Sequence, residues 1–286
     1  MSQLPKIQEE MDLMSDMRSI MEVMKSIALT GFIDSKKLRE QRYEYFNKSF
    51  DGFFQVADLT HAEHPFIKAA SSKVCIIAVT SSESFMAGLN NRVMKLAFSK
   101  TEGLEKHFII TGPRMMGKLK NEGIAYTMFP GIKIKNMVDI ATQIKDFVLQ
   151  KVLDKEFGRV VCVFAYPESI SKQEVRAVTL IPAESAYPEE MKASIIDPDE
   201  EVFIESEFDN LMMHLNELWL ISKLIHTFQD HKMSEGAAQA MQLDGNLENL
   251  MDYEKKLKMA FVKTRREVID TSLRETVSAM MAAPQH

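Results

Sequence analysis

The stretch LENLMDYEKKLKMAFVKTRREVIDTSLRETVSAM, residues 247–280, decides the fold that we expect of this chain. It contains neither Gly nor Pro, the residues that most strongly break a helix. Apolar and small side chains recur in it at near-heptad steps, at Leu250, Tyr253, Leu257, Ala260, Thr264, Val268 and Thr271. A second apolar stripe follows beside them, at Ile269, Leu273, Val277 and Met280. This spacing predicts a helix of about 50 Å that packs lengthwise against another helix.

The N-terminal end of the chain carries a matching pattern. Residues 7–28 also lack Gly and Pro. Their apolar side chains alternate steps of four and three, at Leu13, Met17, Ile20, Met24 and Ile27. We predict that this stripe forms the coiled-coil contact. A further stripe, Met11, Met14 and Met21, predicts that the helix touches more than one neighbour.

A second helical segment precedes the C-terminal one. Residues 207–228, EFDNLMMHLNELWLISKLIHTF, are amphipathic. We expect them to be joined to the last helix through the connection HKMSEGAAQAMQLDGN, residues 231–246.

Between the two ends, apolar strand-like runs alternate with helical segments. The runs are residues 74–80, 107–111, 125–129, 159–166 and 174–182, and the helices lie near 88–98, 114–122 and 137–155. This alternation predicts a small Rossmann-like α/β domain. Its boundaries are expected near Pro65 and near the acidic turn at 195–201, which divides the chain into 1–64, 65–206 and 207–286.

Composition excludes several functional classes. With 35 basic and 41 acidic residues the net charge is -6, which gives no general reason to bind nucleic acid. Acidic residues near the N-terminus argue against a secretory signal or a transit peptide, and no apolar run approaches the ~20 residues that span a bilayer. Cys75 and Cys162 lie in apolar runs and are expected to be buried thiols.

One segment raises the alternative of a nucleotide-binding enzyme. GPRMMGK, residues 112–118, follows a strand and has the Gly-x-x-x-x-Gly-Lys spacing of a phosphate-binding loop. Leu119 stands where such loops need a hydroxyl for Mg²⁺, and Met115 and Met116 stand where the backbone would wrap phosphate. An ordinary strand-to-helix turn with a solvated Lys118 is the better interpretation.

Other catalytic and metal-binding patterns are missing from the sequence. His61 and His64 in HAEH are one helical turn apart, but a third ligand is not evident. The segment VTSSESFMAGLNN could bind an anion at a helix start, although a capping turn is the simpler role. We therefore expect no catalytic, cofactor-binding or metal-binding residues.

The whole pattern resembles the gamma subunit of rotary F-type ATP synthases. The segments that carry the resemblance are SIMEVMKSIA (19–28), HPF (64–66), IIAVTSSESFMAGLNNRVMK (76–95), IDPD (196–199), SEGAAQAM (234–241) and the end of the chain, YEKKLKMAFVKTRREVIDTSLRETVSAM (253–280). In the last segment the residues in family register are Lys263, Arg265, Ile269, Leu273, Glu275 and Val277. The resemblance implies an α/β insert domain between two terminal helices that form a long antiparallel coiled coil.

This chain departs from the usual family pattern at several positions. Met24 is kept, but Glu22 and Val23 precede it where members have Lys and Ala. The run 84–87, SFMA, replaces Gly-Leu-Cys-Gly. Arg266 stands for a Gln and Asp270 for a Thr. These changes suggest a divergent branch, similar to the alternate ATPases encoded beside a conventional enzyme.

The resemblance also implies a role without catalysis or a cofactor. The partners would be the alpha and beta subunits of the catalytic hexamer, the epsilon subunit and the c-subunit ring, with no nucleic acid. The complex would lie on the cytoplasmic face of a bacterial membrane, with this chain as a peripheral subunit. Contacts with the hexamer are expected from Met24, Arg265, Arg266 and Asp270. A coiled-coil scaffold outside any rotary machine is the remaining alternative.

Overall fold

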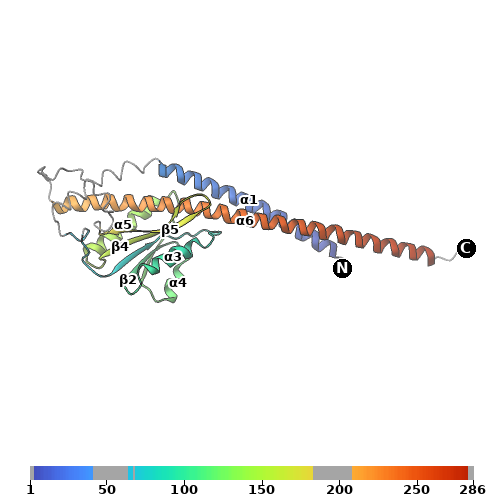
Figure 1. Ribbon diagram of the computed structural model, residues 1–286, viewed down its shortest axis with the longest axis horizontal. Coiled ribbons are helices and arrows are strands. Elements are labelled where there is room, and N and C mark those ends of the chain that lie inside the picture. The colour runs from blue at the N-terminus through green and yellow to red at the C-terminus, as the bar shows by residue number, and fades with distance from the viewer. Residues whose placement is uncertain (1–2, 41–63, 67, 183–207, 283–286) are drawn as a thin grey trace. The chain divides into compact units, whose positions relative to one another are not determined.

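The computed structural model of the chain describes residues 3–40, 64–66, 68–182 and 208–282 (Figure 1). Contacts within the chain divide it into two units. One unit combines Met1–Ile27 with Ala240–His286, and the other is Ala28–Gln239. The first holds the two ends of the chain, and the second holds the α/β fold.

A five-stranded sheet forms the centre of the α/β unit. Its strands are β1 (Val74–Ala78), β2 (Lys106–Thr111), β3 (Tyr126–Phe129), β4 (Arg159–Pro167) and β5 (Gln173–Ile181). Their order is β3-β2-β1-β4-β5, and only β5 runs antiparallel to its neighbour. All five predicted strands are confirmed within a few residues, because their continuous β-branched and aromatic runs suit a sheet that is buried on both faces.

Helices cover both faces of this sheet (Figure 1). On one face α3 (Leu89–Ser99) and α4 (Met116–Asn121) enclose a core with alternate strand residues such as Ile76, Phe108 and Val163. On the other face α5 (Met137–Leu153) and the first turns of α6 (Phe208–Ala282) pack on the intervening residues. The structure thus confirms an α/β layer domain.

Both cysteines are free thiols inside this core. Cys75 and Cys162 have no exposed surface. Burial raises the pKa of the Cys162 thiol to about 12 and the pKa of Cys75 further still. The expectation of buried thiols is confirmed.

Two long helices hold the ends of the chain. They are α1 (Gln3–Glu40) and α6 (Phe208–Ala282), and α6 is unbroken over 75 residues. The predicted connection at 231–246 is therefore wrong, because the helix passes through it. Gly236 is in the helix for a packing reason: a Cβ there would lie 2.9 Å from the carbonyl oxygen of Ala28, so glycine lets α1 approach α6 closely.

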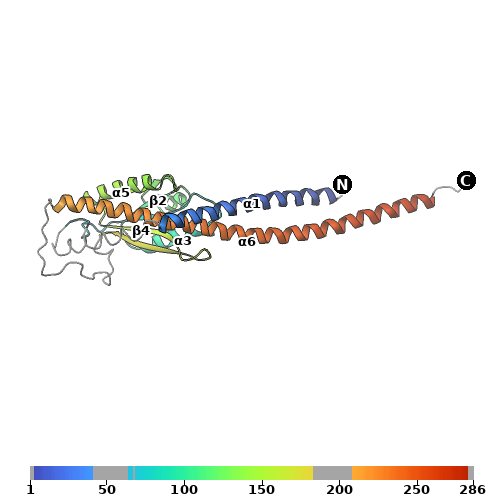
Figure 2. The same cartoon turned by 90° about the horizontal axis from the view of Figure 1, so that it is seen from above.

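In the unit formed by the chain ends, α1 and α6 run side by side in opposite directions (Figure 2). Among the less exposed residues of α1, seven follow a heptad, Leu4, Ile7, Met11, Met14, Arg18, Met21 and Lys25, with Glu10 and Met24 beside them. On α6 the heptad is Leu243, Leu247, Leu250, Glu254, Leu257, Phe261 and Thr264, with Gln242, Asp244 and Asn246 also half-buried. The predicted antiparallel coiled coil is confirmed.

The stripe predicted to form the contact on α1 was wrong. Four of its five residues are exposed, Leu13 at 55%, Met17 at 37%, Ile20 at 60% and Ile27 at 67%. The stripe of Met11, Met14 and Met21 faces α6 instead. Two charged residues favour contact through this methionine stripe, because Arg18 and Lys25 lie in the same stripe and form ion pairs with acidic residues of α6.

On α6 the prediction is half right. Leu250, Leu257 and Thr264 belong to the contact, and Tyr253 reaches α1 through its hydroxyl although it is 42% exposed, whereas Val268 is 43% exposed. Ala260 and Thr271 are exposed as well. A near-heptad pattern with small residues does not define which side of a helix is covered.

Candidate functional site

Polar pairs fix the register of the helical pair. Arg18 donates from Nη1 to Oε2 of Glu254 at 3.4 Å, and the Glu254 side chain is only 12% exposed. Lys25 pairs with Asp244. The Tyr253 hydroxyl donates to Oε1 of Glu10 at 2.6 Å, which raises the pKa of Tyr253. Because a shift by one residue would separate all three pairs, they select one alignment of the helices.

The residues predicted to contact a hexamer fall at two levels of this unit. Met24 is half-buried, next to Lys25 and its partner Asp244. Arg265 follows Asp244 by 21 residues (265 minus 244), or about 30 Å of helix. Arg266 and Asp270 are one turn apart and line a shallow groove of about 470 Å³ on the surface of α6. The three are exposed.

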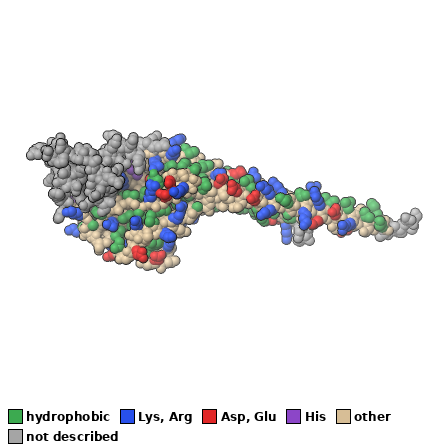
Figure 3. All heavy atoms as spheres, viewed as in Figure 1, with side chains coloured by type: hydrophobic (Ala, Val, Ile, Leu, Met, Phe, Trp, Pro, Cys, Tyr) green, Lys and Arg blue, Asp and Glu red, His purple; other side chains and the backbone are tan. Residues whose placement is uncertain are grey.

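The helical pair exposes much apolar surface (Figure 3). On α1 the exposed stripe consists of Leu13, Met17, Ile20, Val23 and Ile27. On α6 every residue from 265 to 281 is exposed, and six of these are large and apolar: Val268, Ile269, Leu273, Val277, Met280 and Met281. Contiguous apolar surface of this kind marks an interaction site.

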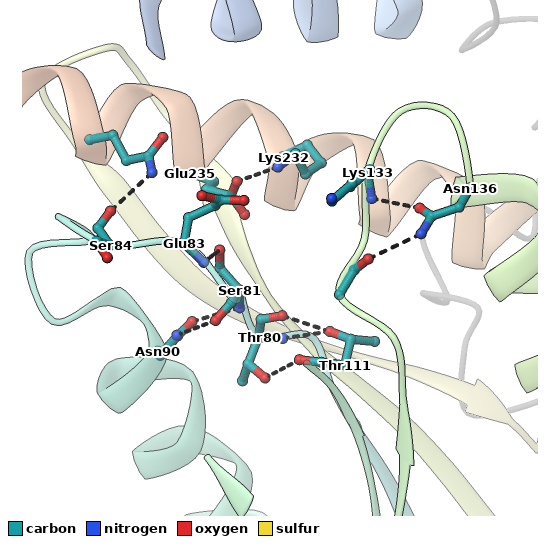
Figure 4. A network of polar contacts seen from close by, with 12 residues as sticks. Thr80, Ser81, Glu83, Ser84, Asn90, Thr111, Lys133, Asn136, Lys232 and Glu235 are labelled. Atoms are coloured by element: carbon teal, nitrogen blue, oxygen red, sulfur yellow. Dashed lines mark hydrogen bonds and ion pairs between the residues drawn. The ribbon is translucent and has the colours of Figure 1, made fainter. Parts of the chain in front are cut away.

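In the α/β unit, the carboxyl ends of β1 and β2 carry a compact polar network (Figure 4). The amide of Thr80 donates to Thr111 Oγ1 at 2.9 Å, and that hydroxyl donates to Thr80 O at 2.8 Å. The Asn90 side chain accepts from Ser81 N at 2.9 Å and donates to Ser81 O at 2.8 Å. The loop after β1 is thereby tied to the first turn of α3. The expected capping turn is not seen as a side-chain cap, because the residue before the helix is Gly88, which is left-handed and makes no side-chain capping hydrogen bond.

This edge of an open α/β sheet is where such folds receive ligands. Here α6 occupies it. Glu235 points from α6 toward Ser81 and Glu83 (Figure 4), and its polar interaction with Ser81 favours the ionised carboxylate. Burial raises the pKa of Glu235, although its ion pair with Lys232 opposes the rise. A hollow of about 340 Å³ remains beside the network, lined by Ser82, Gly131, Lys133, Asn136 and their neighbours.

His231 fills the neighbouring position along α6. Its Nδ1 accepts the amide N–H of Ala165 in β4 at 3.2 Å, and the side chain is 1% exposed. Burial lowers the pKa of His231 to about 3, so the ring is neutral with its proton on Nε2. One turn beyond Glu235, Gln239 donates to Ser84 O at 2.9 Å.

The GPRMMGK segment forms a turn at residues 112–115 that leads into α4, which begins at Met116. The amide N–H groups of Met116 and Lys118 donate to Pro113 O at 3.1 Å and to Met115 O at 3.2 Å, so they are not available to surround a phosphate. The geometry gives the nucleotide-binding alternative no support. Arg114 donates from Nε to Ser82 O at 2.7 Å. The Lys118 ammonium lies 5.3 Å from the centre of the Phe98 ring.

Metal ligands do not gather in the described part of the chain. Among those residues no three of His, Cys, Asp or Glu lie close enough to hold an ion. His61 lies outside the described residues, and His64 accepts the amide N–H of Phe66 through Nδ1 at 3.3 Å. Within the same ranges no helix is long and apolar enough to cross a membrane.

The sequence alone did not reveal the roles of His231 and Glu235. Both stood in a segment interpreted as a connection because it contains two glycines and several polar residues. The signal that could have found them is their spacing of four, which continues to Gln239 and places all three on one stripe of a helix.

Comparison with known proteins agrees with this architecture. The profile of the protein family described as ATP synthase matches residues 3–283. An ATP synthase gamma chain from Bacteroides fragilis is 24% identical over 298 residues, covering 99% of this chain and 100% of the relative. One from Nitratiruptor is 25% identical over 225 residues, or 74% of this chain and 73% of the relative.

Solved structures share the fold. A chain in the Euglena gracilis mitochondrial ATP synthase, in the part comprising OSCP, F1 and the c-ring, has a TM-score of 0.69 with 15% identity. The match covers 98% of this chain and 94% of that one. A chain in the rotor of the same enzyme has a TM-score of 0.65 with 14% identity, covering 93% and 98%.

Proposed function

The chain belongs to the ATP synthase family, as a non-catalytic subunit of the central stalk, and we propose that its helical pair turns inside a ring of alpha and beta subunits. The observation that carries this proposal is the apolar surface of the helical pair. Leu13, Ile20 and Ile27 are each more than half exposed, and so are Leu273 and Met280. A surrounding sleeve of subunits would cover them, while smooth apolar contacts would still let the helices turn.

An uneven shaft would make identical catalytic sites behave differently. A site changes its affinity for ADP, phosphate or ATP only if its conformers contact the shaft unequally. The helical pair offers such unevenness, because one stripe of α1 is apolar and the tip of α6 is a single helix. Rotation would then carry each site through the same sequence of affinities.

We assign four residues to the contact with the hexamer. Met24, which is half-buried on α1, would contact the surrounding ring of subunits. Arg265, Arg266 and Asp270, which are exposed on α6, would contact the ring closer to the C-terminal end of that helix. The exposed charges would act as position-dependent catches on acidic or basic loops of the ring. Each such surface pair contributes only about 0 to 1 kcal/mol, which permits release at every step.

The α/β fold would provide the contacts with the membrane sector. We assign it the contact with the c-subunit ring and the epsilon subunit. In this proposal residues 1–64 and 207–286 belong to the shaft and residues 65–206 to the inserted domain. The complex would sit on the cytoplasmic face of a bacterial membrane, with this chain as a peripheral subunit.

Replacement of both arginines tests the assigned catches. Arg265→Ala with Arg266→Ala in the assembled complex should reduce ion transport per ATP hydrolysed several-fold, because the rotor can slip past the sites. Assembly should be unchanged. The matched control is Lys255→Ala with Lys256→Ala, an exposed basic pair ten residues earlier on α6 (265 minus 255).

The outcomes separate the alternatives. Unchanged transport per ATP in the arginine variant would remove these two residues from the mechanism. Purification of the native chain without alpha and beta subunits would instead support a coiled-coil scaffold outside a rotary machine.

A further inference from the structure

We propose that three side chains of α6, His231, Glu235 and Gln239, prevent this helix from rotating about its own axis. These positioning residues, which we call the key, contact the α/β fold where β1 and β4 separate. This inference rests on the proposed rotor function. It identifies the contacts through which torque would pass from the sheet to α6. All the contacts involved lie within the unit Ala28–Gln239.

The crevice arises where β1 and β4 separate. The last main-chain bond between them runs from Val79 N to Val163 O at 2.9 Å. Two residues further on, the amide of Ala165 donates to His231 Nδ1 at 3.2 Å. A side chain of α6 thus takes over the hydrogen bond that a longer β1 would have accepted. In other open sheets this position is left for a ligand.

Three polar side chains enter the crevice from one stripe of α6. His231, Glu235 and Gln239 are spaced four residues apart, so they stand above one another over about 12 Å of helix. They meet different parts of this end of the fold: His231 contacts the Ala165 amide of β4, and in the loop after β1 Glu235 faces Ser81 and Gln239 contacts the Ser84 carbonyl. Helix rotation by one residue, about 100°, would break all three contacts together.

Burial makes these contacts hard to exchange. His231 and Glu235 are 1% and 3% exposed, so water cannot replace a lost partner without opening the core. A buried polar or charged group that loses its partner is strongly unfavourable, whereas apolar side chains slide past one another at little cost. The key therefore resists twist better than the surrounding apolar packing.

A second clamp holds the other side of α6. Arg39 on α1 pairs through Nε with Asp230 Oδ1 at 2.8 Å, and its Nη2 donates to the Tyr166 hydroxyl of β4 at 3.0 Å. At Gly236 the helix lies against the backbone of α1. The second half of α1 and the sheet thus hold α6 from two directions.

A load experiment on the assembled complex tests the key. The variants are Glu235→Ala, and Ser81→Ala, which removes the hydroxyl that faces Glu235 and that also accepts the amide N–H of Glu83 at 3.0 Å. The measurement is single-complex rotation driven by ATP, with a bead fixed to the α/β unit, as a function of opposing load. We expect unloaded speed within twofold of wild type and a stalling load reduced at least twofold in both variants. A merely structural role would not alter the load curve.

Two further variants serve as controls. Glu235→Gln keeps a hydrogen-bonding group at Ser81 and should recover most of the stalling load. Leu218→Ala changes a half-exposed residue of α6 in the same unit and should match wild type. If Glu235→Ala fails to assemble, the Ser81→Ala curve decides.

Each result bears on one proposal. Wild-type stalling loads in Glu235→Ala and Ser81→Ala would overturn the key and leave the rotor function standing. A wild-type complex in which the chain does not rotate would overturn the rotor function itself, and with it the key.

Discussion

Gly236 and Gly245 lie in the same helix, but they differ in what a methyl group would meet. At Gly236 a Cβ would lie 2.9 Å from Ala28 O and 3.0 Å from Phe32 N, both backbone atoms of α1. At Gly245 nothing lies within 4 Å. Gly236→Ala should therefore lower the free energy of unfolding by about 1–3 kcal/mol, because backbone atoms must shift.

Gly245→Ala is the matched control for that prediction. It should raise the free energy of unfolding by up to about 1 kcal/mol, since alanine favours a helix more than glycine does. Urea unfolding of both variants measures the difference. Equal effects of the two substitutions would show that the close approach of α1 at Gly236 is not rigid.

Asp230 and His231 are neighbours whose pKa values move so that their effects on stability oppose each other. Burial raises the pKa of Asp230 from 3.8 to about 6 despite the nearby Arg39 and Arg176, so the folded state binds the extra proton between those values. Its contribution is present at low pH and is lost as pH rises through 6. For His231 the pKa falls from 6.5 to about 3 through burial and Lys232, so its contribution is present above pH 6.5 and is lost toward pH 3.

A variant that removes one of these two groups should make the effect of the other on the pH dependence of stability measurable. His231→Asn should make the protein gain stability on acidification from pH 6 to pH 4, with a slope of up to ~1.4 kcal/mol per pH unit from Asp230. Asp230→Asn should show the opposite slope from pH 6.5 downward. Denaturant midpoints at several pH values check both signs, and identical slopes in the two variants would contradict the assignment.

At the scale of the elements, the charged positions in the coiled-coil contact set the alignment of α1 and α6. Arg18→Glu should lower the melting temperature, because it places a carboxylate beside Glu254 and leaves that buried group without its partner. The exchanged variant Arg18→Glu with Glu254→Arg should recover most of the loss. Thermal unfolding of the three variants tests this, and an exchange that recovers nothing would show that the pair does not define the register.

Sequence patterns predicted some features of the helices and strands and not others. All five strands were predicted because β-branched runs such as VCIIA leave little choice of structure. The covered face of α1 was not, because both of its stripes are apolar and only the partner helix decides between them. The continuity of α6 was missed because Gly236 looks like a break until the backbone of α1 is seen against it.

The functional residues, too, could be predicted where local sequence decides and not where distant parts of the chain meet. The turn at GPRMMGK could be judged correctly from Met115, Met116 and Leu119 alone. The crevice contacts of His231 and Glu235 could not, because they join residues more than 60 positions apart in the chain, such as His231 and Ala165 (231 minus 165 is 66). The assignments of Met24, Arg265, Arg266 and Asp270 stay predictions.

At the scale of the whole molecule, the exposed stripe of α1 should matter for assembly and not for folding. Leu13→Ser with Ile20→Ser and Ile27→Ser should change the free energy of unfolding by less than about 0.5 kcal/mol per site, since these side chains are already more than half exposed. The same variant should fail to assemble with alpha and beta subunits, because the apolar surface that they would cover is gone.

The covered stripe provides the control for that prediction. Met11→Ser with Met14→Ser and Met21→Ser should instead lower the free energy of unfolding by about 1 kcal/mol per site through lost apolar burial. Circular dichroism melts and gel filtration of reconstituted complexes separate the two effects. An exposed-stripe variant that assembles normally would contradict the proposed sleeve.

The contact between the helices ends at Thr264, and α6 continues alone to Ala282, 18 residues further (282 minus 264). A lone helix bends and twists more readily than a braced pair, so this stretch is the most compliant part of the unit. Its free end would therefore adjust its path to the inner surface of a surrounding sleeve as the shaft turns.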